Sequence, residues 1–483
     1  MIRALCLFIG LALVASAAAW LADHPGNIAV DWQDWRIETS VAAGAVAFAL
    51  LLAAGALSYR SWLWLRRSPR NIGQARRDSR HRRGEIALNS GWTTLAAGEA
   101  GEALKLGRRA ETLLDQSPLP LMLSAQAAQQ VGDVSVATRL YHRMLDRPDT
   151  EFLGVRGLLI LALRASDAQA ALRYARRAQA LRPDSPWAQN LLFDLQSAAG
   201  LWHEAQTTLE DASRRKVFDK STGRRRKALT LFAQAREADE AGETEKAAGL
   251  ARDGNALAPD FVPGTLLAAR HFQAGGESGK AARAIEACWR TSPHPELAAL
   301  YLALQPGDDP ARRVRRITRL DRLNAGHREG HAALAGVLAA ARRWHEAHAH
   351  LDKALAEREE PRLLRLMAQV EEGEHGTGAA GTWLQKVSAA PPDDTWICTG
   401  CGTVTQTWGP HCGQCGRFDS LAWGPPPALP PGAAVVAVEA EAGNSGSSAA
   451  LARLSETMPD VAEPAAALPV LQGGGVDASP PKA

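Results

Sequence analysis

Four of the six cysteines of this 483-residue chain lie within 18 residues near its C-terminal end. They form two Cys-x2-Cys pairs with ten residues between the pairs: Cys398, Cys401, Cys412 and Cys415. Two tight turns of this kind present four thiolates to one point, which is how a tetrahedral Zn(II) site is built. The spacing therefore predicts one structural zinc site with these four ligands. Two disulfides are the alternative, and they require an oxidising compartment.

A glycine directly follows three of these cysteines, at Gly402, Gly413 and Gly416. Glycine adopts positive φ without strain, so we expect all three to turn backbone N–H groups toward the sulfurs. Residues 403–407 are typical of a short strand. The aromatic residues that can supply a small apolar core are Trp396, Trp408, Phe418 and Trp423. We therefore expect a zinc-ribbon or rubredoxin-like module in residues 391–423.

Two uncharged apolar stretches, residues 4–22 and 41–59, precede everything else. At about 1.5 Å of rise per residue, each just spans a hydrocarbon core of about 30 Å. Residues 1–60 are thus predicted to form a transmembrane helical hairpin with a short external loop. The alternative is that residues 1–19, which end in small residues, are a cleaved signal peptide, leaving one span.

Charges around the second stretch predict its orientation. The loop before it carries four acidic residues against Arg36, whereas residues 60–83 carry nine arginines against Asp78. The positive-inside rule places the loop outside and the rest of the chain in the cytoplasm, with residues 61–89 as a basic juxtamembrane segment. A cytoplasmic location keeps thiols reduced, which favours the metal over disulfides. The alternative for the arginines is a patch for nucleic acid or anionic lipid.

The middle of the chain repeats itself, mostly in steps of 34 residues. Glycines mark the turns at Gly98, Gly132, Gly200, Gly242 and Gly276, Ser166 fills the missing slot, and extending the period reaches a further mark at Arg342, with weaker units near Gly307 and Gly376. Alanine stands five residues after each clear mark, and a small residue usually stands twelve after it. This is the pattern of paired helices in tetratricopeptide (TPR) arrays. The sequence predicts an all-α fold, a TPR solenoid of nine units over residues 90–390.

Composition and motif searches exclude several functions. The net charge of +3 gives no global nucleic-acid signature, and residues 396–423 contain Arg417 as their one basic side chain. Residues 276–280 resemble a phosphate loop, but Ala281 replaces the hydroxyl that such a loop needs. Since no catalytic constellation is found, we expect no enzyme. Residues 424–483 are rich in Pro, Ala, Gly and Ser and are expected to be disordered.

Two further clusters leave alternatives open. The histidines His327, His331, His345 and His348 fall on consecutive predicted helices and could converge on a metal or a haem. Otherwise they are surface histidines, because Ala347, Leu351 and Ala354 are the packing positions of the second helix. The basic residues within 214–227 are either a solvated helix extension or a docking patch for an acidic partner.

The paired spans, acidic loop, arginine-rich exit and the string Thr150-Glu-Phe-Leu-Gly-Val-Arg-Gly-Leu158 within a TPR array resemble the HemY family over residues 1–390. These are bacterial inner-membrane TPR proteins associated with haem synthesis. The resemblance implies a multi-pass protein of the inner membrane whose repeats face the cytoplasm. It also implies a scaffold in late protohaem synthesis with pathway enzymes such as ferrochelatase as protein partners.

The cysteine module is similar instead to the C-terminal rubredoxin-like module of LapB-like proteins. Those proteins have one span and a TPR array, and they deliver a lipopolysaccharide deacetylase to a membrane protease. Two functions therefore remain open from resemblance, a scaffold for haem synthesis and an adaptor for lipopolysaccharide synthesis. A haem or porphyrin carrier is a third, and it would need the histidine cluster or the TPR groove to hold the ligand.

Overall fold

The computed structural model describes residues 35–114, 117–376 and 378–427 together with short runs elsewhere: 8–9, 12–13, 15–16, 19–20, 23, 26–32, 450 and 453–454. Most of the first predicted span and most of the tail expected to be disordered therefore lie outside the described residues. The chain divides into two units, Met1–Leu123 and Ser124–Ala483, and each is described by itself.

The first unit is built on one long helix, α2 (Val41–Ala96), which begins where the hydroxyl of Ser40 accepts the N–H of Ala43. Before it, β1 (Asn27–Trp32) and β2 (Trp35–Ser40) form an antiparallel hairpin where the sequence predicted only a loop. Within the described residues, one segment is long and apolar enough to cross a membrane, Ala43–Leu63 of α2.

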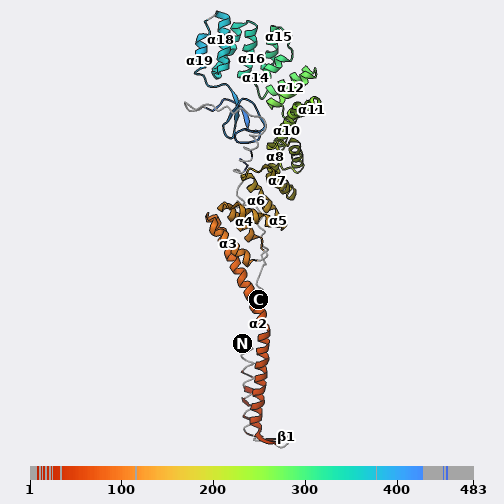
Figure 1. The fold of residues 1–483 in the computed structure, drawn as a ribbon, viewed down its shortest axis with the longest axis vertical. Helices are drawn as coiled ribbons and strands as arrows, with labels where there is room; N and C mark the ends of the chain where they lie inside the picture. Colours follow the sequence, from red (N-terminus) through yellow and green to blue (C-terminus); the bar gives the residue numbers. More distant parts are fainter. Residues whose placement is uncertain are drawn as a thin grey trace, which may run out of the picture. The chain divides into compact units, whose positions relative to one another are not determined.

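The other end of α2 packs on α3 (Ala100–Leu113) in the manner of a repeat (Figure 1). A Cβ atom on Gly84 would lie 2.6 Å from a carbon of Leu114, so glycine permits this close approach. The apolar segment and the first helix of the array are therefore parts of one continuous helix.

From α5 to α19 the described chain is a succession of helices in which neighbours along the sequence pack on one another, as in TPR proteins. The remaining helices are α4 (Leu119–Val131), α5 (Val134–Leu145), α6 (Glu151–Arg164), α7 (Ala168–Leu181), α8 (Pro186–Ala198), α9 (Trp202–Arg214), α10 (Lys220–Glu240), α11 (Thr244–Leu257), α12 (Val262–Ala274), α13 (Ser278–Trp289), α14 (Pro295–Ala303), α15 (Pro310–Asp321), η1 (Arg322–Asn324), α16 (Arg328–Ala340), α17 (Trp344–Glu357), α18 (Pro361–His375) and α19 (Gly381–Val387).

The repeat marks are the turns of this array. The seven clear marks all have positive φ: Gly98 (87°), Gly132 (83°), Ser166 (55°), Gly200 (72°), Gly242 (77°), Gly276 (76°) and Arg342 (58°). Glycine suits this left-handed conformation because it has no Cβ to clash with the next carbonyl. The weaker mark at Gly376 also has positive φ (89°), whereas Gly307 does not. There Asp309 caps α15, and Pro310 starts the helix by a different turn.

The predicted packing positions are buried as expected. The alanines five residues after each mark are 0% exposed: Ala103, Ala137, Ala171, Ala205, Ala247, Ala281 and Ala347. The residues at the second small position are likewise buried, including Ala110, Ala178, Ala212, Cys288 and Ala354 at 0%. Small side chains let neighbouring helices approach closely, so a TPR-like repeat array is confirmed.

The string that resembled HemY has a packing role. Its two glycines, Gly154 and Gly157, lie on α6 against α5. A Cβ on Gly157 would come within 2.3 Å of the ring of Tyr141, which is 1% exposed and donates a hydrogen bond of 2.7 Å to Gln129. The ring has no room to retreat, so glycine is required at this position.

We expect Gly157→Ala to destabilise the array by about 1–3 kcal/mol, the usual cost of overpacking a core. The matched control is Gly249→Ala on α11, where an added Cβ meets nothing within 4 Å. There alanine should stabilise the helix by about 0.5–1 kcal/mol. Urea unfolding of both variants measures this, and equal effects at the two positions would contradict the packing role of Gly157.

The cysteine-containing part forms a small sheet after the last helix. Its strands are β3 (Thr395–Cys398), β4 (Val404–Thr405) and β5 (Leu421–Gly424), in the antiparallel order β4-β3-β5. The expected strand at residues 403–407 is thus present but shorter. Trp396 pairs with Thr405 on one side and with Trp423 on the other.

Candidate metal centre and its docking surface

The two cysteine pairs form two turns with the same backbone pattern. In the first, the N–H of Gly402 donates to Cys398 O (2.9 Å) and the N–H of Cys398 to Thr403 O (2.9 Å). In the second, the N–H of Gly416 donates to Cys412 O (2.8 Å) and that of Cys412 to Arg417 O (3.0 Å). Each turn therefore presents its two sulfurs in the same way.

Gly402 and Gly416 occupy equivalent places in these turns and have φ of 75° and 65°. The expectation of positive φ at Gly413 is wrong. Gly413 follows the first cysteine of its turn, at the place that Thr399 fills in the other turn, where an ordinary residue suffices.

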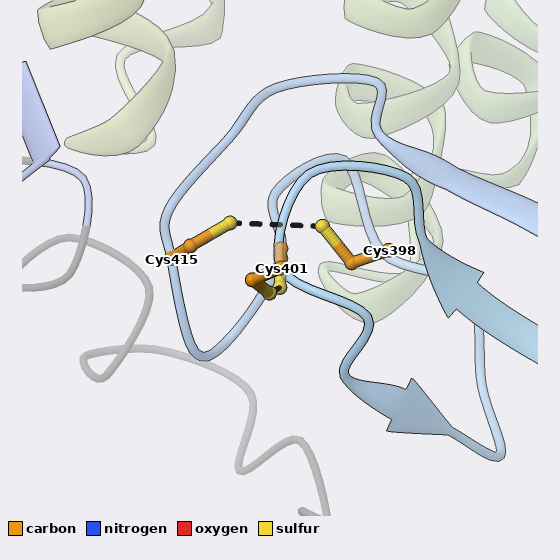
Figure 2. A group of neighbouring side chains, drawn as sticks. Cys398, Cys401 and Cys415 are labelled. Atoms are coloured by element: carbon orange, nitrogen blue, oxygen red, sulfur yellow. Dashed lines mark hydrogen bonds between the residues drawn. The ribbon is translucent and has the colours of Figure 1, made fainter. Parts of the chain in front are cut away.

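The four sulfurs are gathered within 4.8 Å of one another. Cys398 Sγ lies 3.6 Å from Cys415 Sγ, and Cys401 Sγ lies 3.7 Å from Cys412 Sγ, as Figure 2 shows for the first of these pairs. A Zn(II) ion with bonds of about 2.3 Å to four sulfurs in a tetrahedron requires S–S edges of about 3.8 Å. A disulfide requires about 2.05 Å. The donor set thus fits a tetrahedral metal ion.

The surroundings of the sulfurs also suit thiolate ligands. Cys398 Sγ donates to the hydroxyl oxygen of Ser420 at 3.3 Å, and the N–H of Gly400 donates to Cys398 Sγ at 3.4 Å. Burial opposes ionisation of Cys398, but hydrogen bonds with Ser420, Cys401 and Gly400 outweigh it and lower its pKa to about 6. Burial raises the pKa of Cys412 to about 12. A cation is therefore needed to hold all four sulfurs as thiolates.

The module packs against the repeats rather than standing apart, and Figure 1 shows the small sheet on the inner side of the curve of helices. Trp408 packs with Phe261 and Phe232, at ring distances of 4.7 and 5.5 Å. Phe418 packs on Phe193 of α8 at 5.1 Å. These contacts come from α8, α10 and the start of α12, so the module bridges several successive repeats.

The face of the repeats that contacts the module is called the docking surface here, and ion pairs join it to the module at two places, Arg225 and Arg328. Arg225 of α10 makes a two-pronged hydrogen bond to Asp419, with both distances 3.0 Å. At the second place, Arg328 at the start of α16 pairs with Glu360 (2.7 Å) and with Asp394 of the segment that leads into β3. Glu360 is 0% exposed, so its charge depends on these partners.

The same network continues into α18. Arg362 pairs with Glu360 at 2.8 Å and with Glu329, while its backbone N–H donates to Asp393 at 2.9 Å. Arg358 pairs with Asp394. Alternating charges of both signs thus join the last repeats to the two aspartates that precede the module.

His294, which precedes α14, packs against the module and is 1% exposed. Its ring stacks on Trp396 at 5.7 Å and meets Trp423 edge-on at 4.2 Å. The ring nitrogen Nδ1 accepts the N–H of Glu296 at the start of α14. Burial lowers the pKa of His294 to about 4, with Glu329 opposing and Arg362 supporting the shift. The imidazole is therefore neutral at pH 7.

We expect this histidine to make the fold sensitive to acid. The unfolded chain binds a proton on His294 below about pH 6.5, but the folded chain does so only below about pH 4. The free energy of unfolding therefore falls as the pH falls from about 6.5 to about 4, by about 3 kcal/mol in full. Urea unfolding of the wild type and His294→Gln across this range measures the contribution. Parallel pH profiles for the two proteins would contradict it.

The four candidate histidines do not meet at one point. His348 pairs with Asp352 and Glu371, both at 3.0 Å, and His345 is exposed. His327 caps α16 by accepting the N–H of Glu329. His331 Nδ1 lies 3.2 Å from Nδ1 of His350. A haem role for these residues stays a prediction that this arrangement does not favour.

The basic stretch at residues 214–227 is engaged within the chain. Arg225 pairs with Asp419, and Arg226 lies over the rings of Phe193 and Phe218. The acidic partner of this surface thus includes the chain's own module. The sequence analysis did not identify His294 or Arg328 as residues that contact the module. The one feature of the sequence that could have indicated such a contact is the acidic pair Asp393-Asp394, directly before β3.

Comparisons with known proteins agree with the resemblance for part of the chain. Residues 26–132 match the family model described as "HemY protein N-terminus". "Probable magnetosome protein Mms48" of Magnetospirillum gryphiswaldense is 25% identical over 439 residues, which cover 88% of this chain and 93% of that protein. The resemblance to HemY is thereby confirmed for the N-terminal part.

Two solved structures are similar at a low level. "Structure of Naa15/Naa10 bound to HypK-THB" has a TM-score of 0.33 and 15% identity, covering 63% of this chain and about half (53%) of that chain. A tetratricopeptide repeat protein from Parabacteroides merdae has a TM-score of 0.27 and 13% identity, covering 53% of this chain and 99% of that chain. With scores this low, the TPR-like fold rests on this chain's own turns and packing.

Proposed function

We propose that this chain is a membrane-anchored TPR scaffold that holds protein partners in the concave groove of its repeats. The observation that carries the proposal is the continuity of α2, which joins an apolar segment, Ala43–Leu63, directly to the first helix of the array. Because the apolar segment and the repeats belong to one chain, a partner bound to the repeats is held at the membrane in which that segment is anchored.

The groove itself is suited to a protein segment. Residues of α14, α16 and α18 line a groove of about 860 Å³, and Ala298, Ala332 and Gly336 are among its small apolar lining residues. The exposed Arg313 and Arg365 also line it. A lining of small apolar residues together with exposed charged ones is the usual chemistry of a site that binds another protein's segment.

In this proposal Zn(II) is bound by Cys398, Cys401, Cys412 and Cys415 and has a structural role. The metal holds the module together, and the module in turn ties α8, α10 and α12 to α16 and α18. Because solenoid repeats contact only their neighbours, such a cross-tie limits how far the groove can open.

We further propose two spans, with the hairpin outside and the repeats and module in the cytoplasm of a bacterial inner membrane. The arginines that follow the apolar segment support this orientation. A reporter active only in the cytoplasm should work when fused after residue 90, and one active only outside should work near Asp31. The reversed pattern would contradict the orientation, and N-terminal sequencing distinguishes two spans from one.

The pathway is proposed from the HemY resemblance, with late haem synthesis first and LapB-like regulation of lipopolysaccharide synthesis second. Affinity purification of the tagged chain from membranes should enrich late haem enzymes, and deletion of the gene should raise haem precursors. If instead deletion stabilises the lipopolysaccharide deacetylase and leaves porphyrins unchanged, the adaptor function is correct. Porphyrin turnover by the purified chain alone would contradict a scaffold role.

A further inference from the structure

Individual residues of the C-terminal tail are buried, one of them against the repeats. Ala450 and Leu454 are 3% and 6% exposed, and both are helical. Leu454 belongs to an apolar cluster with Leu159 of α6 and with Leu191 and Leu195 of α8. A leucine of the tail therefore packs among leucines of two successive repeats.

The neighbouring residue Arg453 lies in the same cavity as the carboxylate of Asp194. It lines a polar cavity of about 520 Å³ together with Asp194 of α8 and Arg226 of α10. Burial raises the pKa of Asp194, and the positive charges of Arg226 and Arg453 oppose that shift. A half-buried carboxylate between two repeats thus faces an arginine that the tail supplies, beside the leucine pocket.

We propose that Arg453 and Leu454 are an internal ligand of the groove between α6 and α10. This part of the groove then recognises an arginine followed by a leucine, and a partner segment of the same chemistry must displace the tail. The inference rests on the proposed scaffold function, which it deepens by naming the recognised side chains. The groove lined by α14, α16 and α18 is separate from this site.

Because the tail is part of the same chain as the groove, the strength of its competition with a free peptide can be calculated. Because Arg453 and Leu454 belong to the same chain as the groove, they act on it at an effective concentration of about 1 mM. If a free peptide of the same sequence binds the empty groove with a Kd of about 0.1 mM, the tail should weaken its apparent binding about tenfold. A substitution that prevents the tail from occupying the groove should restore the tighter binding of the free peptide.

The test uses the full chain in detergent and a fluorescent peptide of residues 447–458, with anisotropy as the measurement. Leu454→Glu in the chain should tighten peptide binding about tenfold relative to the wild type. Leu471→Glu, which places the same change on a tail leucine outside the described residues, should not. Circular dichroism and retained metal show that each variant is folded.

Peptide variants test the recognition without touching the fold. Against the Leu454→Glu chain, peptides with Arg453→Ala or Leu454→Ala should bind at least tenfold more weakly, and a peptide with Glu456→Ala should bind normally. Equal affinity of the wild-type and Leu454→Glu chains would overturn the internal ligand. Absence of binding to both would overturn recognition by this groove. Neither outcome bears on membrane partners, so failure of the scaffold function itself would be seen separately.

Discussion

Replacing Cys412 with serine in the full chain is expected to reduce bound zinc from one ion per chain to none and to unfold residues 391–423. Cys412 is 1% exposed, and its sulfur lies 3.7 Å from that of Cys401. A module with three short strands has too little core to fold unaided. Structural zinc contributes an apparent binding free energy of about 10–16 kcal/mol, which exceeds any stability that such a module has alone. Metal analysis and hydrogen exchange of residues 391–423 measure the two losses.

The matched control is Cys288→Ala. Cys288 is a buried, free cysteine on α13 at a small packing position, remote in sequence from the module. Its replacement should leave one zinc per chain and normal protection of the module. If Cys412→Ser retains the metal, or if the protein purified under reducing conditions holds no metal and oxidised cysteines, the assignment of the four ligands is wrong.

The second large effect is expected from Arg328→Met, which removes a positive charge from the buried network. Glu360 and Asp394 are 0% and 5% exposed on their side chains, and both pair with Arg328. Loss of one member of a buried ion pair leaves uncompensated charge and typically costs about 3–5 kcal/mol. The module should also loosen from α16, because Asp394 leads directly into β3.

Arg343→Met is the control for this substitution. Arg343 makes an exposed ion pair with Glu346 within one turn of α17, and such pairs contribute little. Urea unfolding should show a much larger loss for Arg328→Met than for Arg343→Met. Limited proteolysis should then release the module from the Arg328 variant first. Equal losses for the two variants would contradict the structural role of the buried network.

The repeat array could be predicted from sequence because its determinants are local. A turn with positive φ needs glycine or a tolerant residue at one position, and a close helix contact needs a small residue at a fixed distance from it. Both requirements recur along the chain, so Gly200 and Ala205 predict the same turn and helix contact as Gly276 and Ala281. The cysteine turns were predictable for the same reason.

The docking of the module could not be predicted, because its partners are far apart in the chain. Arg225 and Asp419 are separated by 194 residues, and Ser197 and His411, whose side chains lie 3.2 Å apart, by 214. No spacing rule relates such pairs. The sequence suggested a docking patch at residues 214–227, but it gave no sign that the chain's own module would occupy part of that surface.

The scaffold function is tested most directly by photo-crosslinking from the groove in living cells. A photoreactive residue in place of Gln369, which lines the groove on α18, should form adducts with haem-pathway enzymes in the membrane fraction. The same residue in place of the exposed Arg252 on α11 should not. Adducts that depend on the groove position are the predicted result. Equal adducts from both positions, or none from Gln369, would contradict a scaffold that holds its partners in the groove.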